Sequence, residues 1–305
     1  MEKLIILTGP TGIGKTEISL KVAKTYNCQI ISADSMQIYK MCDIGTDKIS
    51  IKNTEIKHYM IDEVEPWENY SVATFQEKAK KIITELNNKN ILPLVVGGTG
   101  LYINSLVYNL NFSNVSADKV FRQRLNKLAD EKGTEYIFNK LYELDKTSAL
   151  NIDKNNRNRI IRALEINKFN GNKANNFREK NDQYDLIFLG LYMNREDLYK
   201  RINNRVDQMI SKGLVDEVQN LINMGLDKNS QSLNAIGYKE VVEYLNKKID
   251  YYTMIDEIKK HSRHYAKRQI TWFKRDDRIK WFDRQDPKCL DLIIKYIGEK
   301  CEKIL

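Results

Sequence analysis

Short apolar runs alternate with segments of helical periodicity in the first third of the chain. Strand-like runs occupy Lys3–Thr8, Gln29–Ala33, His58–Val64 and Ile91–Val96. Between them, Thr16–Tyr26 and Ser71–Leu86 place their apolar residues on one helical face, and Ser71 is a suitable N-cap. Strands that alternate with helices predict a parallel α/β sheet covered by helices.

The pattern changes after Phe112. Residues 116–168 show only helical periodicity, and the polar stretch from Asn170 to Tyr184 predicts a linker. A strand-like run returns at Asp185–Tyr192, and the remainder is mostly helical apart from a short strand at Arg278–Phe282. The sequence therefore predicts an α/β core of residues 1–114 and 181–305, interrupted by an all-helical insertion at 115–180.

The composition supports a folded chain without membrane segments. Hydrophobic residues make up 42% and charged residues 30% of the 305 positions, which excludes disordered and fibrous proteins. No apolar run approaches the ~20 residues of a membrane span. The four cysteines form no Cys-x-x-Cys pair, which favours a reducing cytoplasm over a zinc module or a disulfide framework. Nothing in the sequence indicates an obligate dimer, so we expect a monomer.

The net charge of +9 is concentrated in two regions. Residues 115–180 carry 15 Lys and Arg against 9 Asp and Glu, and residues 254–275 carry 7 against 2. A basic excess confined to two places is typical of a surface that binds nucleic acid.

The most specific local motif is a phosphate-binding loop. The string GPTGIGKT from Gly9 to Thr16 fits G-x-x-x-x-G-K-[ST] and lies between a predicted strand and a predicted helix. Its glycines let backbone N–H groups turn inward, Lys15 adds a positive charge, and the Thr16 hydroxyl can hold Mg²⁺. The loop predicts a di- or triphosphate ligand and a P-loop NTPase-like fold.

Asp34 is a candidate site residue, but it follows a different strand from the one that precedes the metal-binding aspartate of ordinary P-loop ATPases. Asp34 stands at the end of the second predicted strand, where side chains point into the ligand crevice of an open α/β sheet. An N-cap role is the structural alternative. The apolar run Ile91–Val96 instead leads into Gly97-Gly98-Thr99-Gly100, which a simple tight turn would also explain.

Three basic patterns are candidate phosphate contacts. Lys and Arg residues between 259 and 275 are interleaved with aromatic residues at near-helical spacing, although a solvated helix face gives the same pattern. Arg159 and Arg162 share a helical face, with ion pairs to Glu165 as the alternative. Arg201 and Arg205 also share a face.

Several strings occur together in order. They are the loop Gly9–Thr16, Ser32–Tyr39, Asp43–Thr46, Gly97–Tyr102, Arg159–Glu165, Ala235–Glu240 and Ala266–Phe273. The ordered set resembles the tRNA dimethylallyltransferase family of bacteria, also called tRNA isopentenyltransferases, over nearly the whole chain.

The resemblance implies a reaction. Members of the family transfer a dimethylallyl group from dimethylallyl diphosphate to the N6 amine of the adenine 3′ to the anticodon, with Mg²⁺. By this resemblance Gly9, Thr11, Gly12, Gly14, Lys15 and Thr16 bind the diphosphate with Arg205, Thr16 holds the metal, and Asp34 is the general base. Lys15, Thr16 and Arg205 would stabilise the leaving group.

The resemblance also implies a tRNA surface for the anticodon stem-loop, which includes the helical insertion. The matching positions are Asp34, Ser35, Met36, Gln37, Ile38, Thr99, Asn158, Arg159, Ile160, Ile161, Arg162, Lys267, Arg268 and Gln269, with Arg122 as a further expected contact. The target adenine would have to leave its stack to reach the site.

Three other functions stay open at this point. An adenylate isopentenyltransferase acting on free AMP, ADP or ATP would share the loop and Asp34, but it would not need a basic insertion. An ATP-dependent P-loop phosphotransferase would show a nucleotide preference. A non-catalytic RNA-binding protein would not need an intact Lys15, Thr16 and Asp34.

Overall fold

The computed structural model describes residues 1–50, 54–110, 112, 118–169 and 179–302. The chain divides into two compact units, the first formed by Met1–Val107 with Asn181–Leu305 and the second by Tyr108–Lys180. The second unit begins seven residues before the insertion predicted from the sequence. The predicted boundary at residues 114 and 115 and most of the predicted linker lie outside the described residues.

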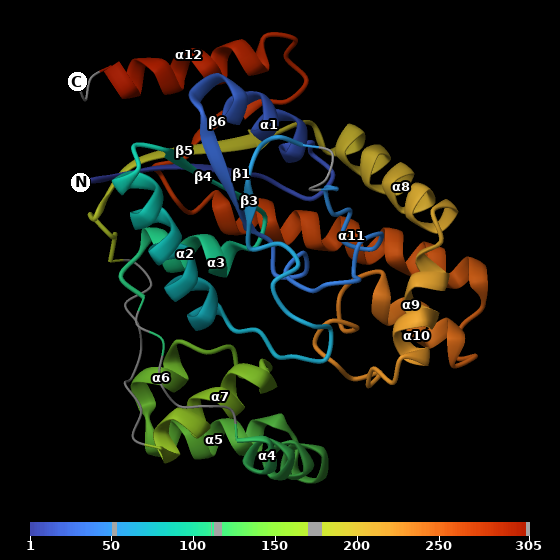
Figure 1. Ribbon diagram of the computed structural model, residues 1–305. Helices are drawn as coiled ribbons and strands as arrows, with labels where there is room; N and C mark the ends of the chain where they lie inside the picture. The colour runs from blue at the N-terminus through green and yellow to red at the C-terminus, as the bar shows by residue number, and fades with distance from the viewer. Residues whose placement is uncertain (51–53, 111, 113–117, 170–178, 303–305) are drawn as a thin grey trace. The chain divides into compact units, whose positions relative to one another are not determined.

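The first unit is built on a parallel sheet of six strands in the order β3-β2-β4-β1-β5-β6 (Figure 1). The strands are β1 (Glu2–Thr8), β2 (Cys28–Ala33), β3 (His58–Tyr59), β4 (Leu92–Gly97), β5 (Tyr184–Tyr192) and β6 (Lys280–Asp283). The central strand β1 is buried from Leu4 to Thr8, with four consecutive apolar residues, as expected for a strand covered on both faces. The predicted fold class is confirmed.

Helices cover both faces of this sheet. On one face α1 (Lys15–Tyr26) contacts α12 (Cys289–Glu302), and on the other α2 (Val72–Asn88) packs against α3 (Gly100–Val107) (Figure 1). The predicted N-cap of α2 is confirmed, because the Ser71 hydroxyl accepts a hydrogen bond from the Thr74 N–H.

The strand predicted at His58–Val64 is mostly wrong. Strand β3 ends after two residues because Met60 (φ 63°) and Asp62 (φ 55°) adopt left-handed backbone conformations that interrupt sheet pairing. The end of the segment still pairs with the chain after β2, through an isolated parallel bridge between Tyr39 and Val64.

Four helices fill the interval between β5 and β6. They are α8 (Arg195–Ser211), α9 (Leu214–Asn223), α10 (Tyr238–Leu245) and α11 (Tyr251–Phe273). Helix α11 packs against both α8 and α3, so it runs past the carboxyl ends of the central strands. Of the helices in the described residues, none combines the length and apolar character needed to span a bilayer.

Among its described residues, the second unit consists of helices and their connections, with one isolated antiparallel bridge between Tyr108 and Lys180. It contains α4 (Lys119–Lys132), α5 (Thr134–Leu144), α6 (Lys146–Leu150) and α7 (Arg157–Lys168), packed around their own apolar core. Asp118, Asp145 and Asn156 cap the N-termini of α4, α6 and α7 with side-chain oxygens.

A buried carboxylate joins α4 to α7. Glu165 is fully buried, accepts two bonds from Arg122 (2.9 and 2.7 Å) and one from the Asp118 N–H (2.8 Å), and pairs with Arg162. Burial alone would raise the pKa of Glu165, but the hydrogen bonds from both arginines lower it to about 2. The ion-pair alternative considered for Arg162 is therefore present.

We expect Glu165→Gln to destabilise the helical unit by about 2 kcal/mol at pH 7, because the amide leaves two arginines without their carboxylate. The pKa of Glu165 in the folded protein lies below the ordinary 4.5 of a glutamate, so this contribution is complete above pH 4.5 and is lost as the pH falls toward 2. Hydrogen exchange of α7 amides and melting between pH 5 and 2 would measure both effects.

The exposed Glu131, with its long 3.9 Å pair to Lys127, provides the matched control. Glu131→Gln should change the free energy of unfolding by less than ~0.5 kcal/mol. Equal effects of the two substitutions would contradict the role given to the buried carboxylate.

Candidate active site

The phosphate loop follows β1 and leads directly into α1. Gly12 (φ 77°) and Gly14 (φ 92°) adopt left-handed conformations that residues with a Cβ rarely take. Gly14 occupies the N-cap position of α1 without a side-chain cap, so the first N–H groups of the helix are open to an anion. The loop is thus shaped as the sequence motif predicts.

Lys15 is the charged centre of the loop. Its ammonium donates hydrogen bonds to the carbonyl oxygens of Gly9 (2.9 Å) and Pro10 (3.0 Å). Burial lowers the pKa of Lys15 to about 8; the charge of Asp34 raises it and the charge of Arg205 lowers it further. Three residues that are far apart in sequence therefore interact electrostatically at one point.

Helix α8 brings both of its predicted arginines to the loop. Arg205 donates to the Thr11 hydroxyl (2.8 Å) and to the carbonyl of Thr46 (3.4 Å). Arg201, one turn earlier, donates from Nε to the carbonyl of Gly12 (3.0 Å). Only Arg205 was assigned to the site from sequence, although the i, i+4 spacing already placed Arg201 on the same face.

The acidic residue and Thr99 lie together at the ends of β2 and β4. Asp34 directly follows β2, and its Oδ1 accepts a hydrogen bond from the N–H of Met36 (2.9 Å). No helix begins there, so the N-cap alternative for Asp34 is excluded. The Thr99 hydroxyl accepts from the N–H of Ser35 (3.1 Å), which ties the turn after β4 to the segment that carries Asp34.

Two glycines of the Gly97–Gly100 turn admit side chains from α11. A Cβ on Gly98 would lie 2.2 Å from Nε2 of Gln269, and one on Gly100 would lie 2.4 Å from Nε1 of Trp272. The turn is therefore a packing surface for α11 rather than a simple reversal of the chain.

Gln269, one of the expected tRNA contacts, joins two segments of the candidate site. Its side-chain oxygen accepts from the Thr11 N–H (2.8 Å) and its amide nitrogen donates to the Gly98 carbonyl (2.9 Å). Gln269 is 5% exposed, and its side chain connects the phosphate loop to the turn after β4; its contact with tRNA stays a prediction. No local pattern near Gln269 predicts this pairing.

Tyr265 is a site residue that sequence reasoning missed. Burial raises the pKa of Tyr265 to about 12, and the charge of Asp34 acts in the same direction. Hydrogen bonds to the side chains of Thr99 and Gln269 lower it, and Arg268 lies over the ring at 5.7 Å. The phenol therefore stays protonated next to the acidic residue, and the aromatic spacing of α11 was its only sequence signal.

The remaining predicted tRNA contacts differ in exposure. Lys267, Arg268, Asn158 and Arg159 are exposed, whereas Ser35, Met36, Gln37 and Thr99 are half-buried. Ile38, Ile160 and Ile161 are at most 3% exposed, so these three residues pack in the interior. The predicted contacts Arg122 and Arg162 are held by Glu165, and each keeps more than a third of its side chain exposed.

The residues present fit a magnesium ion only together with a diphosphate. Among the described residues, no group of three or more His, Cys, Asp or Glu side chains could hold a metal by itself. Thr16 is exposed in the first turn of α1 beside the loop. A single hydroxyl completed by phosphate oxygens and water is the coordination that Mg²⁺ prefers at phosphate sites.

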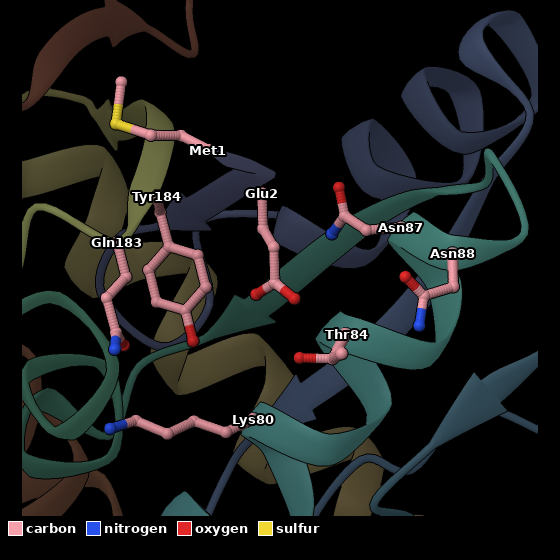
Figure 2. Close-up of a pocket in the computed structure, with 8 residues that line it drawn as sticks. All are labelled: Met1, Glu2, Lys80, Thr84, Asn87, Asn88, Gln183 and Tyr184. Atoms are coloured by element: carbon pink, nitrogen blue, oxygen red, sulfur yellow. The ribbon is translucent and has the colours of Figure 1, made fainter.

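A pocket elsewhere on the first unit is separate from these residues. It has a volume of about 770 Å³ and lies at the amino-terminal ends of the strands, where Glu2 begins β1 and Tyr184 begins β5 (Figure 2). Lys80, Asn87 and neighbouring residues of α2 complete its wall. Its lining includes no residue of the phosphate loop, so it does not belong to the candidate site.

The chain is similar to known proteins in sequence. Residues 37–276 match the sequence model of the IPP transferase family, and residues 2–63 match that of isopentenyl transferases. The tRNA dimethylallyltransferase of Clostridioides difficile is 51% identical over 94% of each chain, and that of Caldanaerobacter subterraneus is 47% identical over 97% of this chain and 96% of its own.

Solved structures are similar along the whole chain. The tRNA isopentenylpyrophosphate transferase of Bacillus halodurans has a TM-score of 0.75 at 40% identity and covers 99% of this chain and 98% of its own. A eukaryotic dimethylallyltransferase acting on tRNA has a TM-score of 0.78 at 27% identity and covers 98% of this chain and 78% of its own. The protein belongs to the IPP transferase family.

The lowered pKa of Lys15 predicts how diphosphate affinity depends on pH. Above pH 8 the free site loses the ammonium charge, so the affinity for an organic diphosphate should fall about tenfold per pH unit. Calorimetric titration between pH 7 and 9.5 would measure this slope and the accompanying proton uptake.

Lys15→Gln should bind weakly with no inflection near pH 8. The exposed Lys24 on the same helix is the control, and Lys24→Gln should keep the wild-type profile. A wild-type affinity that is flat across this range would contradict the lowered pKa.

Proposed function

We propose that the protein transfers a dimethylallyl group from dimethylallyl diphosphate to the N6 amine of the adenine 3′ to the anticodon in tRNA. The new N–C bond forms as the allylic C–O bond breaks, and diphosphate leaves. The observation that carries this proposal is the convergence of Lys15, Arg205 and Asp34 at the ends of β1 and β2. The family and the named relatives support it.

The leaving diphosphate gains negative charge as the C–O bond breaks. The loop N–H groups, the Lys15 ammonium and the Arg205 guanidinium are positioned to stabilise that charge. Thr16 would hold Mg²⁺ against the same oxygens, where the ion neutralises developing charge. Among the described residues, the Lys15 ammonium donates to loop carbonyls and pairs with no carboxylate, so it can turn toward the ligand without breaking an ion pair.

The acceptor amine needs a base as well as a carbon electrophile. Its lone pair is delocalised into the adenine ring, so it must release a proton as the N–C bond forms. We assign this proton to the Asp34 carboxylate, whose second oxygen is free of the Met36 N–H bond. Tyr265, which the charge of Asp34 reaches, and Thr99, which bonds to Ser35, lie near that carboxylate and would orient the amine.

The tRNA partner explains the basic excess of the helical unit and of α11. Residues 115–180 and 254–275 together hold more positive charge than the whole chain. Lys267 and Arg268 are exposed on α11, and Arg159 is exposed on α7. We assign these side chains to phosphates of the anticodon stem-loop, and we expect a cytoplasmic monomer.

The N-terminal match to isopentenyl transferases keeps free AMP as the alternative acceptor. A transfer assay separates the two. With labelled dimethylallyl diphosphate and Mg²⁺, we expect label in tRNA whose anticodon is followed by adenine, and none in tRNA with guanine at that one position. Label in AMP alone would overturn the tRNA assignment, and label in neither would overturn the reaction.

Asp34→Asn tests the base directly. The amide keeps the size of the side chain but cannot accept the amine proton, so the single-turnover rate should fall ~100-fold or more. The affinity for tRNA should stay within threefold, measured by filter binding. Asp291→Asn, at an exposed position of α12 outside the site, serves as the control for removal of one negative charge. An unchanged rate for Asp34→Asn would remove Asp34 from the mechanism.

A further inference from the structure

The turn Asp43–Lys48 touches the leaving-group arginine. The Thr46 carbonyl accepts from Arg205 (3.4 Å), and the Asp47 carboxylate lies 3.4 Å from Nε of the same guanidinium. Gln37 also donates to the Thr46 carbonyl (3.3 Å). The position of this turn therefore determines where the Arg205 guanidinium lies beside the phosphate loop.

One carboxylate from another part of the chain holds the turn. Glu217 on α9 accepts hydrogen bonds from three successive backbone N–H groups, those of Asp43 (3.0 Å), Ile44 (2.8 Å) and Gly45 (3.2 Å). It also accepts from the hydroxyl of Tyr238 (2.6 Å). Four donors on one carboxylate form an arrangement that a neutral side chain cannot reproduce.

The buried Tyr238 holds the Glu217 carboxylate in place through its hydroxyl. The ring is fully buried at the start of α10, and a Cβ on Gly45 would lie 2.3 Å from it. Burial raises the pKa of Tyr238 well above its ordinary value, so the phenol stays a hydrogen-bond donor. The absence of a side chain at Gly45 lets the turn approach both Glu217 and the ring.

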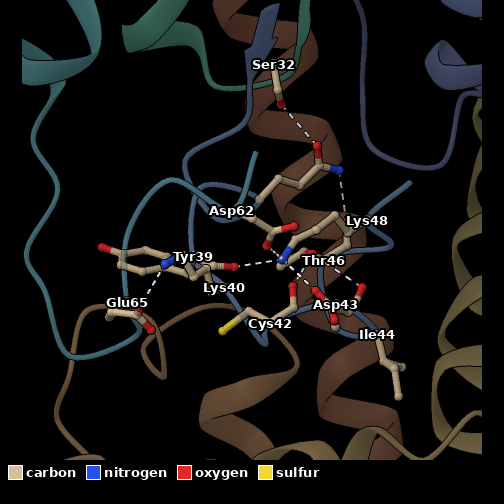
Figure 3. Close-up of polar contacts among 12 residues, drawn as sticks. Ser32, Tyr39, Lys40, Cys42, Asp43, Ile44, Thr46, Lys48, Asp62 and Glu65 are labelled. Carbon is tan, nitrogen blue, oxygen red and sulfur yellow. Dashed lines mark hydrogen bonds and ion pairs between the residues drawn. The ribbon is translucent and has the colours of Figure 1, made fainter. Parts of the chain in front are cut away.

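Lys48 anchors the other end of the turn. Its ammonium donates to the carboxylates of Asp43 and Asp62 (2.6 Å each) and to the Tyr39 carbonyl (2.7 Å), and its side chain is 4% exposed (Figure 3). The turn thus has one charged anchor within its own segment and one, Glu217, from α9.

We propose that Glu217 is a positioning residue for the transfer reaction, which fixes the turn Asp43–Lys48 and through it the guanidinium of Arg205 on the diphosphate. It does not touch the substrate. The proposal rests on the role assigned to Arg205 above. A merely structural role would lower the melting temperature and leave the ligand affinity of the folded protein unchanged.

A double-mutant cycle distinguishes these roles. In Glu217→Gln the amide keeps the shape but replaces one acceptor oxygen with a donor facing an N–H group or the Tyr238 hydroxyl. We expect its affinity for dimethylallyl diphosphate without tRNA to fall ~10-fold, as misplacement of a binding group does. In the Arg205→Ala background the same substitution should weaken binding by less than twofold.

The exposed neighbour Asp216 provides the matched control, and Asp216→Asn should leave the affinity within twofold. Tyr238→Phe keeps the buried ring but removes one donor to Glu217, so its affinity should fall ~3-fold even if Glu217→Gln does not fold. The affinity for tRNA should be unchanged in all variants.

The outcomes separate this inference from the proposed function. If Arg205→Ala weakens binding and Glu217→Gln and Tyr238→Phe do not, Glu217 has no positioning role and the reaction still stands. Equal losses from Glu217→Gln in the wild-type and Arg205→Ala backgrounds would also overturn the inference. If Arg205→Ala binds normally, both the arginine's role and this inference fail.

Discussion

The structure of the site depends on the burial of the Lys15 ammonium within the phosphate loop. Lys15 is surrounded by carbonyls of the residues that precede it, and its charge is partly balanced by Asp34 and opposed by Arg205. Such a group is costly to bury, which its lowered pKa expresses. A diphosphate would relieve this cost, because it brings negative charge to a place already rich in positive charge. The ends of β1 and β2, the phosphate loop and α8 meet at this point.

Much of the fold follows from local pattern. The alternation of apolar runs with helical faces predicted the parallel sheet, the Ser71 cap of α2 is confirmed, and the loop motif with its context located the phosphate site. These features depend on residues close together in sequence, where propensity and periodicity carry the information. The site residues drawn from the family resemblance stay predictions, and the geometry brings Lys15, Asp34 and Arg205 together.

What local pattern missed lies in contacts between distant segments. Nothing near Gln269 indicates that its amide meets the Thr11 N–H, and nothing near Glu217 indicates three N–H donors from a turn that precedes it by more than 170 residues. Local backbone strain was also invisible, since the left-handed residues that end β3 are Met60 and Asp62 rather than glycines. Likewise, Arg122 was expected to contact tRNA, and its bidentate bond to Glu165 requires the packing of α4 on α7.

The bridge made by Gln269 has a consequence for how the sequence can vary. Gly98 has no room for a side chain because the amide of Gln269 occupies that space, and the two positions are 171 residues apart. A larger residue at 98 would displace the Gln269 amide, and the Thr11 N–H would then lose its partner. The glycine turn, the phosphate loop and the end of α11 look like three independent motifs along the chain. Because Gln269 joins them, a substitution in any one of them restricts which residues the other two can carry.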